Sequence, residues 1–408
     1  MLVWAREGDP LPERGRAVKL AEGEPQRILL ERLAPDTRYV YELRDAASKQ
    51  RVLPDDGPGA FRTARAAGRP FTFTVQADSH LDEACSPELY RRTLANALAD
   101  APDFHVDLGD TFMTEKHATR ESAERQYLSQ RYHLGLIGRS APIFLVLGNH
   151  DGEARGPREA NGELALWSLG MRKRFFPNPE PDGFYTGNPE RLDGAGVLEN
   201  WYAWEWGDAL FVALDPYWTS APNRGGREPW NATLGKAQYD WLAATLARSR
   251  AAHKLVFVHQ LTGSYHASGR GGAEAAVYQE WGGKELDGSE GFAQHRPGWE
   301  LPIHRLLVKH GVELVFHGHD HFYARQELDG VVYQLVPQPA HRNARSHHAQ
   351  EYGYSRGEFL PSSGHLRVTV APESLLVEYV RAGLPEHERQ GVRNGTLAAS
   401  YRIKGPKR

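Results

Sequence analysis

The sequence predicts an α/β fold behind a small β segment, on three observations. Over residues 71–382, apolar runs of strand length alternate with amphipathic helical segments, which is typical of α/β layering. Residues 1–66 contain only short strand-like segments and turns, so we expect a small β domain there. Residues 383–408 show neither pattern and are expected to form a C-terminal tail.

The composition is that of a globular protein with a packed core. Of the 408 residues, 40% are hydrophobic and 25% are charged, and the net charge of −3 indicates neither a nucleic-acid polymer nor a membrane as partner. The single cysteine, Cys85, excludes an intramolecular disulfide. No apolar run is long enough to span a bilayer, and the opening MLVWAREGDP lacks the pattern of a signal peptide. Either the protein is cytoplasmic or a leader lies outside this sequence, and the oligomeric state stays open.

Individual elements follow from local patterns. In the N-terminal segment, RILLERL (27–33) and RYVYELRD (38–45) read as strands around the turn APDT, and GAFRTARAAGRP (59–70) reads as a linker. Helices are predicted over 88–100, 235–249 and 303–310. After residue 321 two β-hairpins are expected, one of them turning at Asp329-Gly330, a favoured two-residue turn.

Polar residues recur where the predicted strands of the second segment end. The strands are FTFTVQA, FHVDLGD, APIFLVLGNHD, KLVFVHQ and VELVFHG. Ligands of open α/β sheets bind at the carboxyl ends of the strands, so these side chains are expected to meet at one edge. The residues concerned are Asp78 and His80, Asp110, Asn149, His150 and Asp151, His259, and His319 with His321.

Each of these residues alone has an ordinary structural explanation. An aspartate at such a place caps a helix or closes a turn, and a lone histidine is more often a core or surface residue than a ligand. The same explanation would have to apply at five strand ends, which favours a shared site instead. Carboxylates and imidazoles without thiolates suit Zn, Fe or Mn, and a carboxylate can bridge two such ions.

This series of motifs resembles that of the calcineurin-like metallophosphoesterases. The matching stretches are Asp78-x-His80, Gly109-Asp110, Gly148-Asn149-His150-Asp151, His259 and Gly318-His319-x-His321. The resemblance implies a four-layer α/β/β/α sandwich over residues 71–382. Residues 1–66 resemble part of a fibronectin type III domain, an arrangement similar to that of purple acid phosphatases. By the same resemblance the protein would be exported or periplasmic.

The resemblance also implies roles for the residues. Asp78, His80 and His321 would hold one metal ion, Asn149, His259 and His319 would hold the second, and Asp110 would bridge both. A hydroxide between the ions would attack phosphorus. His150 would stabilise charge or protonate the leaving group beside the substrate, and Asp151 would orient the His150 ring.

One position departs from the purple acid phosphatase pattern. Met113 stands where those enzymes have a tyrosine ligand, three positions after the bridging aspartate. No tyrosinate–iron(III) colour is therefore expected, and the two divalent or trivalent ions stay open among Mn, Zn and Fe.

The stretch VFHGHDHFY (315–323) also resembles the metallo-β-lactamase motif H-x-H-x-D-H. It is one residue short of that motif and comes late in the ligand series. We therefore take His319 and His321 as ligands of a centre like that of the calcineurin-like metallophosphoesterases. Alternate residues of an extended loop point the same way, which favours this pair. His317 is expected in the core or in support of a ligand, and Asp320 is expected to point away and to serve a turn or support a ligand.

The substrate is the least determined part of the prediction. His266, Arg270 and His341 lie in the polar loops 262–300 and 338–350 and are the expected substrate-binding residues, in addition to Asn149 and His150. The alternative is that these loops are solvated surface. We expect hydrolysis of a small phosphoester, with the arginines favouring monoesters. The alternatives are a phosphodiesterase acting on nucleotides or phospholipid head groups and a non-catalytic phosphate-binding protein.

Overall fold

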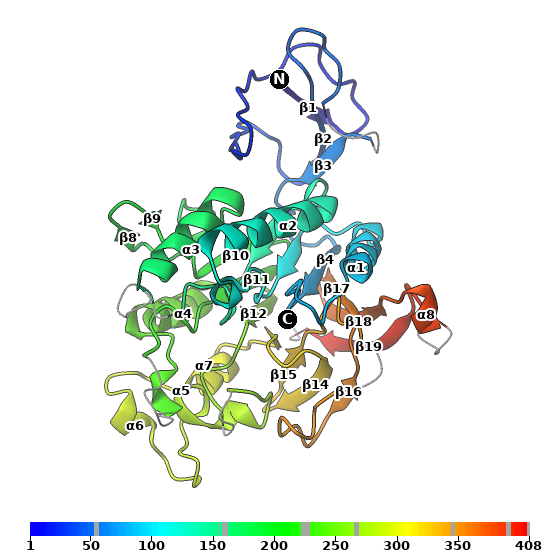
Figure 1. The fold of residues 1–408 in the computed structure, drawn as a ribbon. Coiled ribbons are helices and arrows are strands. Elements are labelled where there is room, and N and C mark those ends of the chain that lie inside the picture. The colour runs from blue at the N-terminus through cyan, green and yellow to red at the C-terminus, as the bar shows by residue number, and fades with distance from the viewer. Residues whose placement is uncertain are drawn as a thin grey trace.

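The computed structural model describes residues 1–52, 57–154, 156, 162–221, 229–264, 269–343, 347–388 and 393–405. Two large sheets lie against each other with helices on their outer sides, and a small N-terminal sheet projects from one end (Figure 1). Within the described residues, no helix is long and apolar enough to cross a membrane.

The first large sheet has six strands in the order β19-β18-β17-β4-β5-β6. Its strands are β4 (Phe71–Gln76), β5 (His105–Asp107), β6 (Ile143–Leu145), β17 (Gly364–Ala371), β18 (Ser374–Arg381) and β19 (Leu397–Lys404). β4, β5 and β6 are parallel, so their carboxyl ends share one edge of the sheet. β17 and β18 form one of the predicted hairpins.

The second large sheet has eight strands in the order β16-β14-β15-β13-β12-β11-β10-β7. Its strands are β7 (Thr186–Gly187), β10 (Tyr202–Trp206), β11 (Ala209–Leu214), β12 (His253–Val258), β13 (Leu314–His317), β14 (Tyr323–Leu328), β15 (Val331–Leu335) and β16 (Glu358–Leu360). β11, β12, β13 and β15 are parallel. The hairpin of β14 and β15 turns at Asp329-Gly330, as the sequence predicted.

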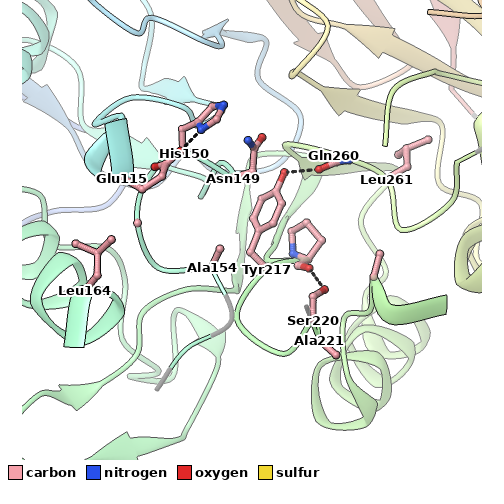
Figure 2. A pocket seen from close by; sticks show the side chains of 13 residues that line it. Glu115, Asn149, His150, Ala154, Leu164, Tyr217, Ser220, Ala221, Gln260 and Leu261 are labelled. Carbon is pink, nitrogen blue, oxygen red and sulfur yellow. Dashed lines mark hydrogen bonds and ion pairs between the residues drawn. The ribbon is translucent and has the colours of Figure 1, made fainter. Parts of the chain in front are cut away.

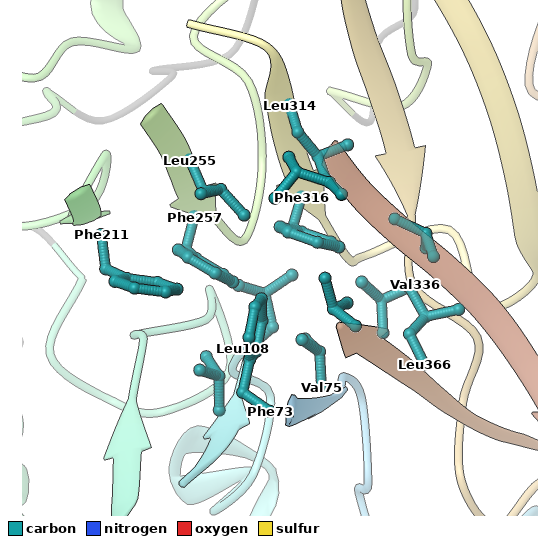
Figure 3. Packing of buried hydrophobic residues seen from close by; sticks show 14 of the residues in the cluster. Phe73, Val75, Leu108, Phe211, Leu255, Phe257, Leu314, Phe316, Val336 and Leu366 are labelled. Atoms are coloured by element: carbon teal, nitrogen blue, oxygen red, sulfur yellow. The ribbon is translucent and has the colours of Figure 1, made fainter. Parts of the chain in front are cut away.

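The core between the sheets is built from alternate residues of facing strands (Figure 3). Phe73 of β4 lies edge-on to Phe211 of β11, with ring centroids 5.2 Å apart, and also contacts Phe257 and Phe316. Side chains of a strand point alternately to its two faces, so the residues between these face the helices instead. Apolar burial on both faces explains why the parallel strands read as nearly continuous apolar runs.

Helices cover the outer face of each sheet and complete the predicted four layers. Apolar residues of α1 (Pro87–Ala99), α2 (Arg120–Gly138) and α3 (Gly162–Phe175) form one cluster beside the six-stranded sheet. Those of α4 (Lys236–Arg248) and α7 (Ile303–Lys309) pack on the eight-stranded sheet. The α/β/β/α architecture is therefore confirmed.

The remaining elements are short. They are η1 (Thr114–Lys116), β8 (Arg191–Leu192), β9 (Gly196–Val197), η3 (Pro229–Asn231), η4 (Ala275–Val277), α5 (Gln279–Gly282), α6 (Phe292–His295) and α8 (Pro385–Glu388). Several of them lie in the long loops that border the edge where the parallel strands end.

The N-terminal sheet differs in part from the prediction. It consists of β1 (Leu2–Arg6), β2 (Arg38–Leu43) and β3 (Gly59–Arg62) in an antiparallel arrangement. The stretch 27–33, predicted as a strand, forms none, and β2 pairs with β1 and β3 instead. Hydrogen bonds from the Ala60 amide and the Tyr41 hydroxyl to the Arg139 carbonyl, 2.9 and 3.1 Å long, attach this sheet to the end of α2. The fibronectin-like character of the segment stays a prediction.

The C-terminal segment 383–408 was expected to be a tail. In the structure β19 pairs with β18 from Ser374↔Lys404 to Val380↔Leu397 and forms one edge of the six-stranded sheet. Tyr401 is buried in the core between the sheets. The second segment of the chain therefore extends at least to Lys404.

Candidate metal centre

The parallel strands of both sheets bring the predicted polar residues together at one edge. Asp78 and His80 follow β4, Asp110 follows β5, and Asn149 follows β6. His259 follows β12 of the second sheet directly, and the loop after β13 carries His319 and His321. The site therefore lies where the carboxyl ends of five strands from two sheets meet.

Six of these side chains form two groups that could each hold a metal ion. One group consists of Asp78, His80 and His321, the other of Asp110, His259 and His319, and within each the ligand atoms lie within 4.8 Å of one another. The two groups adjoin, because Nε2 of His80 lies 3.8 Å from Asp110 Oδ2 and Nε2 of His259 lies 3.7 Å from Asp78 Oδ1.

Both aspartates lie between the two groups. Asp110 Oδ2 is 3.3 Å from Nε2 of His259 and 3.8 Å from Nε2 of His80. Asp78 Oδ1 is 3.4 Å from Nε2 of His321 and 3.7 Å from Nε2 of both His80 and His259. A carboxylate in such a position can reach ions in either group, which is what a two-ion centre requires.

The hydrogen bonds of these side chains test whether metal ions fit. Buried polar groups are nearly always paired, so a cluster of unpaired ones calls for an additional partner. Among the described residues, five buried atoms at this edge have no hydrogen-bond partner: Asp78 Oδ1, His80 Nε2, Asp110 Oδ2, Asn149 Oδ1 and His259 Nε2. All five are atoms that coordinate Zn, Mn or Fe, so the donor set fits two such ions.

Electrostatics at this edge also favour bound cations. Burial opposes ionisation of Asp78 and Asp110, but the neighbouring imidazoles outweigh it and hold both pKa values below the usual range. Burial likewise opposes a charge on His259, yet the two carboxylates raise its pKa to about 10. The two carboxylates thus attract positive charge. Protons on the imidazoles supply this charge, and bound metal ions would replace those protons.

Hydrogen bonds to the far side of each ligand aim it into the site. His259 Nδ1 donates to the carbonyl of Leu108 at 2.7 Å, which leaves Nε2 toward Asp110. His80 Nδ1 lies 3.2 Å from Asp82 Oδ2, and Asp78 Oδ2 accepts from the His319 amide at 2.9 Å. Such contacts fix the ring orientation and tautomer of a metal-binding histidine.

The backbone at the site adopts conformations that are costly elsewhere. Positive φ angles occur at Asp78 (59°), His80 (49°), Asp110 (53°), His319 (75°) and His321 (67°). Left-handed backbone at non-glycine residues concentrates where the surrounding structure holds functional groups in place. Close packing adds to this, because a Cβ on Gly318 would lie 2.8 Å from Asp78 Oδ2.

Asp151 requires a correction, because it does not orient His150. Its buried carboxylate accepts from the amides of Gly148 (2.7 Å), Asp110 (3.1 Å), Thr111 (2.8 Å) and Phe112 (2.8 Å). These four donors belong to the loops after β5 and β6, so Asp151 joins the two loops. The Asp151 carboxylate, which was expected to accept a hydrogen bond from the His150 ring, accepts from backbone amides instead.

The ring of His150 contacts Glu115 instead, through Nδ1 (Figure 2). Glu115 lies in η1, and no sequence motif pointed to it. Both residues line a pocket of about 410 Å³ beside Asn149, and the other walls include Tyr217 and Gln260. The Tyr217 hydroxyl donates to Gln260 Oε1 at 3.1 Å, so this wall is polar near the metal ligands.

The predicted substrate-binding residues are less accessible than expected. The Arg270 guanidinium donates to the His319 carbonyl (2.9 Å) and to Asp320 Oδ1 (3.1 Å) and lies 4.1 Å above the Tyr352 ring. His341 Nδ1 lies 3.1 Å from the Asn343 carbonyl. His266 lies outside the described residues.

The other histidine-motif residues stay out of the ligand groups. His317 is buried at the end of β13, where desolvation lowers its pKa to about 4. Asp320 accepts from the Gly271 amide and from the Tyr354 hydroxyl, at 3.0 and 2.6 Å, and anchors the loop that carries Arg270. Met113 is buried directly before η1.

Solved proteins whose fold is similar to that of this chain include PPD1 and PhoD. The purple acid phosphatase PPD1 from yellow lupin (Lupinus luteus) seeds has a TM-score of 0.58 and 15% identity, over 99% of this chain and 69% of that chain. PhoD has a TM-score of 0.60 and 14% identity, over 91% of this chain and 76% of that chain. At these identities the likeness concerns the fold. Among proteins with curated functions, none is significantly similar in sequence.

The family comparison extends from the fold to the site. The model of the calcineurin-like phosphoesterases matches residues 71–323, more than half of the 408 residues, and this range contains every ligand position described above. The chain therefore belongs to the calcineurin-like phosphoesterase family, as a metal-dependent phosphoesterase with ligands for a dinuclear centre.

Proposed function

We propose that the protein hydrolyses small phosphoesters at this dinuclear centre, with the alcohol part of the substrate in the pocket beside it. The observation that carries the proposal is the group of five unpaired buried donor atoms at one sheet edge. A pocket of about 410 Å³ that shares Asn149 and His150 with this edge gives the substrate access to it.

Each side chain has a distinct task in the proposed reaction. Asp78, His80 and His321 would hold one ion, Asn149, His259 and His319 would hold the other, and Asp110 would be placed to reach both. Bound metal ions of this kind lower the pKa of water and neutralise the phosphoryl oxygens. His150 lies at the mouth of the pocket, with its ring centroid 6.4 Å from that of His80, and donates a proton to the departing alcohol.

The contacts of Arg270 change the expectation for the ester class. A preference for monoesters rested on guanidinium groups that are free to bind a dianionic phosphate. Arg270 is already paired with Asp320, and Arg342 donates to the Cys85 carbonyl at 3.0 Å. The proposal therefore covers both monoesters and diesters.

One experiment distinguishes this function from phosphate binding without catalysis. The chelated protein is reloaded with Mn²⁺, Zn²⁺ or Fe²⁺, its metal content is determined, and turnover of a nitrophenyl phosphate monoester, diester and triester is measured. We expect two ions per chain and turnover of monoester, diester or both, with the triester as the weakest substrate. Full loading with two ions and no turnover of any ester would support the binding protein instead.

A further inference from the structure

Glu115 and His150 form a side-chain pair in the lining of the pocket (Figure 2). A carboxylate oxygen of Glu115 contacts Nδ1 of the His150 ring, and the two side chains are 32% and 25% exposed. The pair is thus accessible to a substrate. A contact on Nδ1 leaves Nε2 as the ring atom that can reach a substrate.

The backbone holds both partners of this pair in place. The Thr114 amide donates to the His150 carbonyl at 2.7 Å, and the Thr114 hydroxyl donates to the Asp151 carbonyl at 3.2 Å. The His150 amide in turn donates to Asp110 Oδ1 at 2.8 Å. Glu115 therefore follows directly after a residue that is bonded to the His150 loop, and His150 is bonded to a metal ligand.

The contact has a consequence for the imidazole. An ionised carboxylate accepts hydrogen bonds only, so the pair needs a hydrogen on Nδ1. This choice of tautomer and the direction of the contact orient Nε2 away from Glu115. Residues that fix a histidine in this way typically change activity by about 10–100-fold when they are removed.

We infer that Glu115 is the positioning residue of His150, a role that rests on the proposed function of His150 toward the leaving alcohol. Glu115 keeps a hydrogen on Nδ1 and holds Nε2 where the alcohol oxygen departs. Nε2 takes up a proton from water and passes it to the departing oxygen, and the ring returns to its Nδ1-protonated form. Its contact is with the ring of His150, which is not one of the expected metal ligands. Its removal therefore lowers the rate of bond cleavage and leaves metal binding intact.

The experiment compares Glu115→Ala and Glu115→Gln with wild type. Glu121→Ala serves as the matched control, because Glu121 is 80% exposed on α2 and pairs only with Arg125 among the described contacts. Metal content, kcat and KM are measured with a nitrophenyl ester and with an alkyl ester of the same phosphate. If Glu115 had a purely structural role, its removal would lower kcat by the same factor for both esters and would also reduce the metal content.

We expect Glu115→Ala to keep two ions and to lose about 10–100-fold in kcat for the alkyl ester. The loss should be smaller for the nitrophenyl ester, whose leaving group needs less protonation. Glu115→Gln should recover part of the rate, because its amide oxygen still accepts from Nδ1. In a His150→Ala background, Glu115→Ala should have no further effect. Equal losses in both backgrounds would overturn the inference.

A spectroscopic measurement separates this inference from the proposed function. Nitrogen NMR of the histidine rings, with the His150 signal identified by its absence in His150→Ala, reports the tautomer directly. We expect an Nδ1-protonated ring in wild type and a shift toward the Nε2-protonated form in Glu115→Ala. An unchanged His150 signal would refute the role of Glu115, whether or not the protein turns over any ester. A changed signal with an inactive wild type would contradict only the proposed function.

Discussion

The carboxylate of Asp151 offers the sharpest test of how the centre is held together. Each of its two oxygens accepts from two backbone amides, Oδ1 from Thr111 and Phe112 and Oδ2 from Asp110 and Gly148. Replacement of Asp151 by asparagine keeps the size of the side chain but leaves one acceptor oxygen. The side-chain amide then faces two backbone N–H groups that have lost their acceptor.

The expected cost follows from those two donors. A buried donor without a partner costs about 1–3 kcal/mol, so Asp151→Asn should destabilise the protein by about 2–6 kcal/mol. The loss should extend to metal binding, because the Asp110 amide is one of the four donors and its side chain lies between the two ligand groups. Urea denaturation measures the free energy of unfolding, and metal analysis measures the second effect.

Asp182→Asn is the matched control. Asp182 is exposed, and a single oxygen accepts from the amides of Phe184 and Tyr185 at 3.0 and 2.8 Å, so an asparagine can keep both bonds. Its cost should stay within about 0.5 kcal/mol, as for ordinary surface substitutions. If Asp151→Asn were as stable as this control, the four amides would not need a carboxylate and the bracing role of Asp151 would be refuted.

Three further outcomes are expected. Asp110→Asn should lose bound metal and activity together, and full occupancy with near-normal turnover would contradict a bridging role. His150→Ala should keep both ions and lose about 10²–10⁴-fold in rate, whereas loss of metal would make His150 a ligand. Burial opposes ionisation of Asp100, but hydrogen bonds from His365 and Arg367 outweigh it and lower its pKa, so this contribution to stability is present above pH 3.8 and lost as the pH falls through the lowered pKa. The urea midpoint of Asp100→Asn should therefore vary less with acid pH than that of wild type.

The ligand positions could be predicted because the relevant rule is local and repeated. Each expected ligand lies within four residues after a strand, and parallel strands bring their carboxyl ends to one edge whatever their order in the sheet. The hairpin at Asp329-Gly330 follows from turn chemistry alone, since both positions have positive φ, 49° and 82°. Neither prediction needed knowledge of distant contacts.

The errors arise where pairing partners decide the structure. The stretch 27–33 is rich in apolar residues but pairs with no strand in the structure, and local composition alone does not make a strand. Conversely, Leu397–Lys404 buries only Ala399 and Tyr401 and reads as a weak pattern, yet β18 offers it a free edge along its whole length. In both cases the neighbouring strand, which the local sequence does not reveal, determines the outcome.

The exchange of roles between Asp151 and Glu115 has a related cause. Asp151 adjoins His150 in sequence, which made a contact between them the simplest expectation, but a loop that turns at Gly148 and Gly152 presents the carboxylate to amides of the neighbouring loop. Glu115 is 35 positions away from His150 and reaches the ring because the Thr114 amide is bonded to the His150 carbonyl. Only the packing of the loops shows whether the carboxylate of Asp151 or that of Glu115 faces the His150 ring.

These contacts distinguish the ligand-bearing loops, which buried hydrogen bonds hold in place, from the exposed side chain of Glu115. Gln126 and Gln130 of α2 donate to the backbone or side chains of the loops after β4 and β5, and Asp151 joins the loops after β5 and β6. Every loop that carries a ligand of the six-stranded sheet is thus held by buried hydrogen bonds whose loss is costly. Glu115 is exposed and contacts the ring of His150. We therefore expect variation at Glu115 to change the reaction of the leaving alcohol while both ions stay bound, and we expect the pocket wall to influence substrate preference more than the ligand set does.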